Sequence, residues 1–485
     1  MDHALIDVLV VGAGGTGLTL ACDLARRGVS ALVVEQQDAL FPGSRGKGLQ
    51  PRTQEVFDDL GVIAAVRAAG GPYPKMLAWQ GEKRVREWEL IEPAPAEPGV
   101  PYPNPVMIPQ WRTQQILHAR LLELGGSVAF GTRLAGFTQD ADAVTAELAA
   151  ADGATRTVRA RYLVAADGGR STVRRALGIA MEGETVDPRP SLVADVRIEG
   201  LGRDNWHSWP EAPGGLLLLC PLAGTETFQL FAQYETGEPD TSFDAIRELV
   251  GERTALGAEA VREVLWASDF RPRAALAERY REGRVFLAGD AAHVHSPAGG
   301  QGLNTSVQDA YNLGWKLGRV LRHGAPDALL DSYQDERRPV AAGVLGLSTK
   351  LHQGTFVGGS GPVQRGKQTS QLGVGYPDST LSVERRTDLP AEALRAGQRV
   401  PDLGYAGSAR LFDLLRGPHA TLLAVGIPAP ELDDPELLVR ELDELAGFGP
   451  GLFLIRPDGY LGLATRDAAD LASYLGLVTG VRQRV

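Results

Sequence analysis

The chain has 485 residues, of which 44% are hydrophobic and 22% charged, and its formal net charge is -11. This length exceeds one ordinary hydrophobic core and predicts about two or three domains. The acidic balance argues against a nucleic-acid or anionic-membrane partner, because such partners attract a basic face.

The cysteines and the apolar runs indicate the cellular location that we expect for the protein. The two cysteines, Cys22 and Cys220, lie far apart in the sequence and have no disulfide or metal-site spacing. They predict a reducing, cytoplasmic location. The N-terminus has no basic region before an apolar core, so we expect no signal peptide. No apolar run reaches the roughly 18–20 residues that a membrane span needs.

The first 35 residues predict a βαβ unit. Residues 6–11 form an apolar run, the glycine-rich segment G-A-G-G-T-G follows directly, and residues 18–27 have helical periodicity. A second apolar run, residues 31–34, ends at Glu35. This is the G-x-G-x-x-G pattern of a dinucleotide site with an acid close to twenty residues after its start.

Each residue of this motif has a physical role. Gly12 allows the tight turn, Gly14 lets the backbone approach a pyrophosphate, and Gly17 lets helix and strand pack closely. Glu35 can accept hydrogen bonds from a ribose, which favours a free 2′-hydroxyl as in FAD or NAD. The alternative, a glycine-rich turn without a ligand, does not account for Glu35.

The next segments predict one further phosphate contact and a second strand–acid junction. Arg45 lies between glycines and is a candidate phosphate contact, although a solvated loop arginine is the alternative. Residues 72–109 are irregular and proline-rich, residues 110–125 form an amphipathic helix, and residues 127–148 and 155–158 form hairpin strands. A buried strand over residues 162–166 then ends at Asp167-Gly168, and a helix follows.

Residues 190–270 read mostly as strands, interrupted by one helix near residues 243–249. The alternation in residues 228–234 predicts a sheet with two unlike faces, which could cover an active site. Possible pocket residues are Trp206, His207, Trp209 and Gln233. The alternative for each is ordinary packing, because aromatic residues usually belong to the core.

A third glycine–acid segment follows in residues 285–304. An apolar strand ends at Gly289-Asp290, a loop with Pro297 and several glycines comes next, and helical periodicity starts at Thr305. The start of such a helix offers backbone N–H groups and a positive dipole end to an electron-rich ligand. Residues 331–338 and 340–353 continue as helix, and residues 354–378 have no periodicity and read as a linker or mobile cover. A small α/β unit begins at Gly397, with strands at residues 421–425 and 452–455 and a helix at 467–475.

The three glycine–acid segments, in this order, resemble the class A flavoprotein monooxygenases, which are FAD-dependent aromatic hydroxylases. The resemblance covers residues 1 to about 345, and the C-terminal unit resembles the thioredoxin-like tail of the phenol hydroxylase branch and its aromatic-polyketide relatives. It implies an α/β fold with a Rossmann-like FAD-binding domain of the glutathione-reductase type, and a mostly antiparallel substrate sheet. The expected division is 1–71, 109–180 and 276–350 for FAD; 72–108 and 181–275 for substrate; 351–396 as linker; and 397–485 as a tail without redox cysteines.

The resemblance assigns the cofactor residues by position. Gly12, Gly14, Gly17 and Glu35 would hold the ADP half of FAD, and Asp290 the ribityl or pyrophosphate region with Arg45 and Gln110 nearby. Asp167-Gly168 would serve both FAD and the reduced nicotinamide. The residues expected against the isoalloxazine ring are Pro297, Gly299, Gly300, Gln301, Gly302, Leu303 and Asn304.

The sequence departs from the family at two positions. Lys47 stands where many members have a small residue, and Gln114 replaces a common acid, which leaves the fine geometry of the Arg45 loop open. No metal is expected, because His293 and His295 have no acid partner nearby in the sequence and read as loop residues.

The reaction implied by the resemblance uses NAD(P)H to reduce FAD, and a flavin C4a-hydroperoxide then transfers oxygen to a phenolic, polycyclic substrate of polyketide or antibiotic type. No residue is identified as the base that deprotonates the substrate. Baeyer–Villiger insertion or epoxidation by the same flavin chemistry is the alternative, and a non-catalytic flavin-binding or ligand-binding protein is a further one. A flavin-dependent halogenase would need G-W-x-W-x-I-P, which residues 206–210 do not match. We expect a monomer or homodimer.

Overall fold

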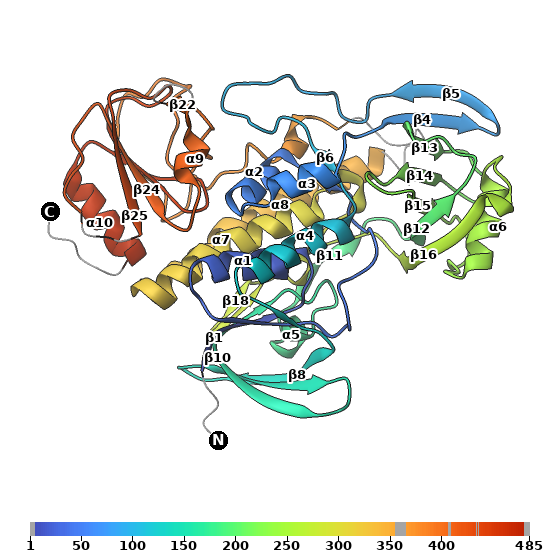
Figure 1. Cartoon of the computed structure of the whole chain (residues 1–485), viewed down its shortest axis with the longest axis horizontal. Coiled ribbons are helices and arrows are strands. Elements are labelled where there is room, and N and C mark those ends of the chain that lie inside the picture. Colours follow the sequence, from blue (N-terminus) through green and yellow to red (C-terminus); the bar gives the residue numbers. More distant parts are fainter. Residues whose placement is uncertain (1–4, 355–364, 406–408, 433, 435, 480–485) are drawn as a thin grey trace.

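A computed structural model of the chain describes residues 5–354, 365–405, 409–432, 434 and 436–479. Three larger sheets organise these residues, with eight, seven and five strands. Figure 1 shows the seven-stranded sheet and the C-terminal sheet at opposite ends of the long axis, with the helices α7 (Gly302–His323) and α8 (Asp331–His352) between them. No helix in these ranges is long and apolar enough to cross a membrane.

The eight-stranded sheet has a parallel centre in the order β19, β10, β1, β2, β7. The apolar runs found in the sequence become its buried strands, and their carboxyl ends share one edge of the sheet. Helix α1 lies between α4 and α7 against this sheet. The elements are β1 (Ile6–Val11), β2 (Ala31–Val34), β7 (Val128–Ala129), β8 (Thr132–Gln139), β9 (Val144–Ala150), β10 (Thr155–Ala165), β18 (Arg281–Glu282), β19 (Val285–Leu287), α1 (Gly15–Arg26) and α4 (Gln110–Glu123).

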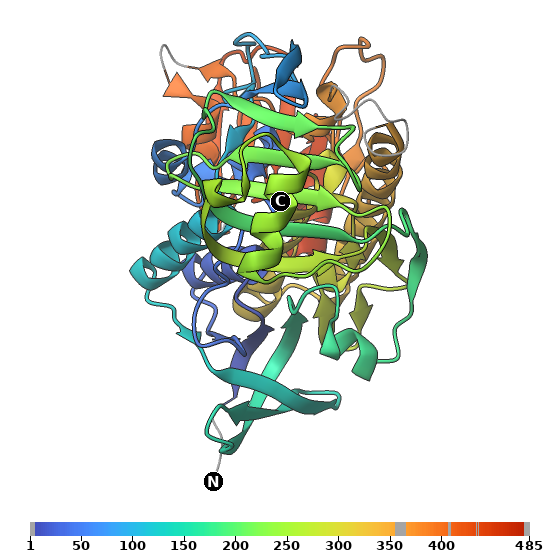
Figure 2. The same cartoon turned by 90° about the vertical axis from the view of Figure 1, so that its right-hand side faces the viewer.

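The seven-stranded sheet has the order β16-β12-β15-β14-β13-β4-β5 and is antiparallel except where β13 pairs with β4. Alternate residues face opposite sides, as the pattern of residues 228–234 predicts. Helix α6 (Phe243–Arg253) lies across the outer face (Figure 2). The strands are β4 (Lys75–Gln80), β5 (Lys83–Trp88), β12 (Ser191–Ile198), β13 (Asn205–Trp209), β14 (Leu217–Pro221), β15 (Phe228–Gln233) and β16 (Val261–Phe270).

The inner face of this sheet is the face opposite α6. Its buried apolar residues include Met76, Trp206, Leu218 and Phe231, and Met107 packs against them. Met107 belongs to β6 (Val106–Met107), which pairs with β3 (Gly48–Leu49) in the segment after Arg45. This short ladder therefore joins the glycine-rich loop near Arg45 to the inner face.

Smaller elements connect the two large sheets. A three-stranded sheet has the order β11-β17-β20; β11 follows the second glycine–acid segment in sequence, and β20 belongs to the third. These elements are β11 (Met181–Thr185), β17 (Arg273–Ala277), β20 (His293–Val294), α2 (Pro51–Asp59), α3 (Ile63–Ala69), α5 (Thr172–Ala176) and the 3-10 turns η2 (Gly289–Ala291) and η3 (Pro297–Gly299).

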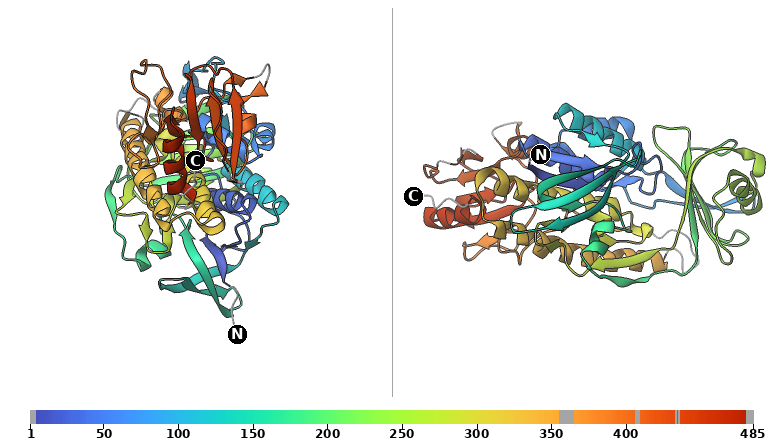
Figure 3. Two further views of the ribbon diagram at one scale, coloured as in Figure 1. Left: turned by 90° about the vertical axis from the view of Figure 1, so that its left-hand side faces the viewer. Right: turned by 90° about the horizontal axis from the view of Figure 1, so that it is seen from below.

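The C-terminal sheet has the order β21-β27-β26-β24-β25, with β24 and β25 parallel (Figure 3). Its core includes Trp315 of α7, so this unit shares its hydrophobic core with the rest of the chain. The elements are β21 (Val383–Glu384), β24 (Ala420–Val425), β25 (Leu437–Leu442), β26 (Gly451–Ile455), β27 (Leu461–Thr465), α9 (Leu411–Leu415), α10 (Ala468–Thr479) and the pair β22 (Gly404–Tyr405) and β23 (Ala409–Arg410). The sequence pattern does not predict β25, because this edge strand, L-L-V-R-E-L, has no clear alternation.

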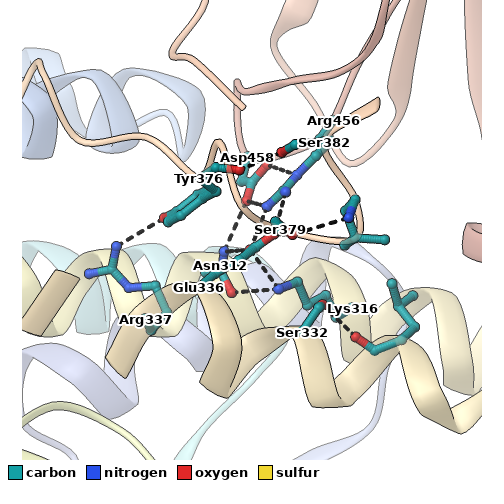
Figure 4. A network of polar contacts seen from close by, with 12 residues as sticks. Asn312, Lys316, Ser332, Glu336, Arg337, Tyr376, Ser379, Ser382, Arg456 and Asp458 are labelled. Atoms are coloured by element: carbon teal, nitrogen blue, oxygen red, sulfur yellow. Dashed lines mark hydrogen bonds and ion pairs between the residues drawn. The ribbon is translucent and has the colours of Figure 1, made fainter. Parts of the chain in front are cut away.

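Buried charges join the C-terminal unit to α7 and α8. The Glu336 carboxylate accepts hydrogen bonds from Lys316 Nζ at 2.8 Å and from Arg456 at 2.6 and 2.9 Å (Figure 4). Asn312 Nδ2 and Ser379 Oγ donate to the same carboxylate, at 2.7 and 2.6 Å. All five side chains come from different turns or segments, so this network orders the junction.

The two helical segments expected after residue 331 form one helix, α8, which runs through Pro339 and has buried side chains on both sides of the proline. In residues 365–378, part of the expected linker or mobile cover, Gln371 and Tyr376 are buried and bond to Gln308 and Arg337. Residues 355–364 of the expected linker lie outside the described residues.

Candidate active site

In the first glycine loop, backbone atoms pack closely against Gly12 and Gly17, whereas the space beside Gly14 is open. A Cβ atom on Gly12, whose φ is +107°, would lie 2.4 Å from the Ala166 carbonyl oxygen, and one on Gly17 would lie 1.9 Å from the Gly12 oxygen. A Cβ on Gly14 would meet nothing within 4 Å. Gly14 is the N-cap of α1, and no side chain caps this helix start, so its first N–H groups can meet a ligand in the open space beside Gly14.

Glu35 follows β2 and lies against this loop. Its carboxylate accepts hydrogen bonds from the Ala13 N–H at 2.9 Å and the Gln37 N–H at 3.0 Å. The acid therefore helps to hold the glycine loop in place, and its remaining lone pairs stay available to a ligand.

The second segment caps a helix and bonds to the third. Asp167 Oδ2 accepts hydrogen bonds from the N–H groups of Thr172 (2.8 Å) and Val173 (3.2 Å), while its Oδ1 is buried without a partner among the described residues. The Arg174 guanidinium donates to the carbonyl oxygens of Gly169 at 3.1 Å and Ala291 at 2.9 Å. The Asp167 and Asp290 turns therefore lie side by side.

Asp290 is an exposed side chain in a buried turn. Gly289, with φ +60°, donates its N–H to Asp309 at 3.1 Å. The surrounding protein desolvates the Asp290 carboxyl and raises its pKa, an effect that the nearby charge of Arg45 opposes.

The expectation that His293 lacks an acid partner is wrong. Its Nε2 lies 2.5 Å from Asp309 Oδ2, and its Nδ1 lies 2.9 Å from His295 Nε2. Asp309 lies sixteen residues further along, on α7, and it also accepts a hydrogen bond from Arg337 Nε at 2.7 Å. Only the tertiary fold brings this acid beside the histidine.

Hydrogen bonds from three other parts of the chain hold the Pro297 loop, and Pro297 itself is exposed. Ser296 Oγ bonds to His352 Nδ1 at 2.8 Å, and Arg365 donates to the Ala298 carbonyl oxygen at 2.7 Å. Asn304 Oδ1 accepts from the Gln50 N–H at 2.8 Å, and its Nδ2 donates to the carbonyl oxygens of Gly48 and Gly300, each at 2.9 Å. Helix α7 then begins at Gly302 without a side-chain cap, so its first N–H groups are free to meet a ligand.

The Arg45 loop is fixed by Gln110 at the start of α4. Gln110 Oε1 accepts from the Gly46 N–H at 2.9 Å, and the Gln110 N–H donates to the Gly46 carbonyl oxygen at 3.0 Å. The exposed Arg45 guanidinium lies 5.3 Å from the ring centre of Phe41 and 5.7 Å from that of Trp266. Gln114, the other departure from the family, is buried under this loop.

The structure separates the expected pocket residues. Trp206 and Gln233 lie on the inner face of the seven-stranded sheet, as the alternation of β13 and β15 requires. Trp209 belongs to the core under α6 and stacks on Trp79 at 5.9 Å between ring centres. His207 faces the same side and bonds to the Trp79 indole at 3.0 Å. The placement of Trp209 and His207 therefore does not support a pocket contact.

Several inner-face groups were missed or not recognised from sequence. His352 Nε2 lies 3.3 Å from Asp187 Oδ2, which also accepts from Gln233 at 2.9 Å, so Ser296 is linked to the sheet through His352. Asp195 of β12 is 3% exposed, and burial raises its pKa to about 6. An aspartate within an otherwise apolar strand, L-V-A-D-V, was the available signal for this group.

The comparisons with known proteins agree on one family. Residues 5–348 match the model of a family described as FAD binding domain. A flavin-dependent monooxygenase of Mycobacteroides abscessus is 45% identical over 481 residues, which is 97% of this chain and 99% of that protein. A 12-dehydrotetracycline 5-monooxygenase/anhydrotetracycline 6-monooxygenase of Streptomyces rimosus is 33% identical, over 94% of each chain.

A solved structure has the same architecture over the whole length. The ternary complex of an aklavinone-11 hydroxylase with FAD and aklavinone is 30% identical, with a TM-score of 0.82, and the match covers 99% of this chain and 100% of that one. The class A resemblance is therefore confirmed, together with FAD as cofactor and NAD(P)H as co-substrate. The chain belongs to the FAD-binding-domain family of flavin-dependent monooxygenases and is an FAD-dependent aromatic monooxygenase.

Proposed function

We propose that this enzyme hydroxylates a phenolic, polycyclic aromatic compound of polyketide or antibiotic type. One observation carries the proposal: the loop that contains the exposed Pro297 is joined directly to the apolar inner face of the seven-stranded sheet. Arg365 makes the connection, because its guanidinium bonds to the Ala298 carbonyl oxygen at 2.7 Å and its backbone N–H bonds to Leu90 at 2.8 Å. Relatives named for tetracycline and aklavinone hydroxylation support a substrate of several fused rings.

The residues present fit FAD. We propose that Gly12, Gly14, Gly17 and Glu35 bind its ADP half, since Gly14 leaves open space where a backbone can approach a pyrophosphate. Asp167 is proposed beside it, with an unpartnered carboxylate oxygen that can accept a hydrogen bond.

The third segment would bind the other half of the cofactor. Asp290 would bind the ribityl or pyrophosphate region, with Arg45 and Gln110 nearby. The ring would lie along Pro297 and the turn that contains Gly299, Gly300, Gly302, Leu303 and Asn304. When bound, the flavin takes electrons from NAD(P)H and supplies the oxygen-transfer chemistry.

The chain itself supplies position and electrostatics. The uncapped N-terminus of α7 offers N–H groups and a positive dipole end to negative charge on the cofactor. Asn304 keeps this turn in place through three hydrogen bonds, and Ser296 and His352 support the loop from the other side. The apolar inner face, with Met76, Trp206 and Phe231, excludes water from the reacting groups.

The domain division is part of the proposal. Residues 1–71, 109–180 and 276–350 would form the FAD-binding domain of glutathione-reductase type, and residues 72–108 and 181–275 the substrate domain. Residues 397–485 would form a thioredoxin-like domain with a structural role, which the shared core around Trp315 supports. Both cysteines lie outside this last unit, so it cannot carry out dithiol exchange.

A substrate screen tests the proposal. NAD(P)H oxidation is recorded for phenols of increasing ring number, and products formed under isotopically labelled O2 are identified by mass and NMR. Ring hydroxylation adds one labelled oxygen and keeps every ring size, whereas Baeyer–Villiger insertion enlarges a ring. Purified protein that is colourless and oxidises no NAD(P)H with any phenol would refute the proposal.

A variant tests the cofactor placement. Asp290→Ala should yield protein without FAD, because the contact to the ribityl or pyrophosphate region is lost. Changes at Pro297 should leave the protein yellow but lower the yield of product per NAD(P)H. Full flavin content in Asp290→Ala would show that the third segment is placed wrongly.

A further inference from the structure

Lys47 extends from the Arg45 loop to the inner face of the seven-stranded sheet. Its Nζ lies 4.3 Å from the ring centre of Trp206 and donates a hydrogen bond to Gln229 Oε1. Its backbone is fixed, because the Lys47 carbonyl oxygen accepts from the Ile108 N–H at 3.0 Å and β3 begins at the next residue. The ammonium group is therefore held at the place where the glycine-rich loop and the sheet meet.

This ammonium group has no counter-ion among the residues that the structure describes. No carboxylate oxygen of these residues lies within 4.0 Å of its Nζ, although an ammonium carries three donors. Lys47 is partly accessible, yet the surrounding protein desolvates it and lowers its pKa. A desolvated cation that has a neutral hydrogen-bond acceptor but no counter-ion is costly, and a bound anion would lower this cost.

Several ionisable groups from different elements lie near Lys47. Asp195 lies on β12 opposite Gln229, and Cys220 lies on β14. Arg365 and Tyr73 are further ionisable groups here, and the positive charge of Arg365 contributes to the lowered pKa of Lys47. Trp206, which the ammonium group contacts, belongs to the apolar cluster of the inner face. A ligand for this place therefore combines a flat apolar body with one anionic oxygen.

We propose that Lys47 binds the ionised oxygen of the aromatic substrate, a phenolate or enolate, through a charge-assisted hydrogen bond. The inference rests on the proposed function and names the form of the substrate that the site selects. The proton of the hydroxyl group is released to solvent as the anion binds. Ionisation makes the ring electron-rich, which is the property that oxygen transfer to an aromatic carbon requires.

The test uses the FAD-loaded enzyme and alizarin, a polycyclic phenol whose visible absorption shifts on ionisation, together with its dimethyl ether. Wild-type enzyme should bind alizarin as the anion at a pH where the free dye is mostly neutral. Lys47→Met should weaken alizarin binding about tenfold or more and abolish the shifted band, because a charge-assisted hydrogen bond is lost. Binding of the dimethyl ether should change less than about twofold.

Two further variants separate charge from packing. Lys47→Arg keeps the positive charge and should keep the shifted band. Lys75→Met removes a lysine from the same sheet whose side chain is 53% exposed, and it should leave both ligands unaffected. FAD content and thermal unfolding are recorded for each variant, so a folding defect is recognised.

Specific results would overturn the inference. These are wild-type enzyme that fails to bind alizarin or binds it as the neutral form, Lys47→Met with wild-type alizarin binding, and equal losses for alizarin and its ether. In each case, NAD(P)H oxidation by the wild-type enzyme with other phenols shows whether the proposed function still stands. If no phenol supports that oxidation, the proposed function fails as well.

Discussion

The three glycines of the first loop give a sharp test of the cofactor site, because the structure separates folding from binding. Gly14→Ala places a methyl group where nothing lies within 4 Å, at a φ of -73° that alanine adopts readily. Gly17→Ala places the same group 1.9 Å from the Gly12 carbonyl oxygen. The two variants differ by one atom each from the wild type and should fail in different ways.

The expected magnitudes follow from these surroundings. Alanine at the N-cap of α1 costs about 1 kcal/mol, and the lower entropy of the unfolded chain offsets about 0.4–1 kcal/mol of it. The apoprotein of Gly14→Ala should therefore be nearly as stable as wild type. Its methyl group would hold a pyrophosphate away from the N–H groups of α1, which should cost about 1.5 kcal/mol or more, at least a tenfold loss in FAD affinity. Gly17→Ala should lower stability by about 3 kcal/mol or more, because the clash is with backbone.

The assay measures both quantities on the same preparations. Urea unfolding of apoprotein gives the stability, and titration with FAD, followed by protein fluorescence, gives the affinity. Gly12→Ala serves as a second packing control, since its Cβ would lie 2.4 Å from the Ala166 oxygen. Wild-type FAD affinity in Gly14→Ala, or a stability loss as large as that of Gly17→Ala, would refute the proposed approach of the pyrophosphate to Gly14.

Three further predictions test other parts of the chain. Burial raises the pKa of Asp195 from 3.8 to about 6, so the protonated carboxyl is tolerated at low pH and the fold loses stability as the pH rises through that range. Asp195→Asn should therefore be more stable than wild type by up to about 3 kcal/mol at pH 8 and equally stable near pH 3. Equal urea midpoints for the two proteins at both pH values would contradict this. Arg456→Met leaves the buried Glu336 carboxylate with fewer donors and should lower the free energy of unfolding by about 3–5 kcal/mol, measured by thermal unfolding. Adding Glu336→Gln in a double variant should restore part of this loss, whereas additive losses would contradict the coupling. His352→Phe removes the bond to Ser296, so the enzyme should keep FAD but form less product and more hydrogen peroxide per NAD(P)H, whereas unchanged coupling would show that the loop does not need this support.

The local patterns of the sequence were sufficient for the cofactor-binding core. The apolar runs before Gly12, Asp167 and Asp290 predicted three strands, and these strands lie side by side in one parallel sheet. The reason is physical: a strand buried on both faces must be apolar throughout, and the turn after it needs glycine. Alternation likewise predicted the two unlike faces of the seven-stranded sheet.

The pattern could not decide which aromatic residue faces the site. Trp206 and Trp209 are three residues apart on one strand, so they point to opposite faces, and only the packing of α6 shows which face is the outer one. Lys47 was noticed only as a departure from the family, because the partner that reveals its place, Trp206, lies more than 150 residues further along.

By itself, the sequence determined the class of this protein: the order of three glycine–acid turns is local information, and each turn needs only its own residues to form. The tertiary structure alone decided what surrounds each ionisable group. It brought Asp309 to His293, Arg456 to Glu336, and the ammonium of Lys47 to an apolar sheet, where no counter-ion lies among the described residues. Charge and burial act through space between residues that are far apart in the sequence, so the surroundings of an ionisable group are set only when the chain is folded.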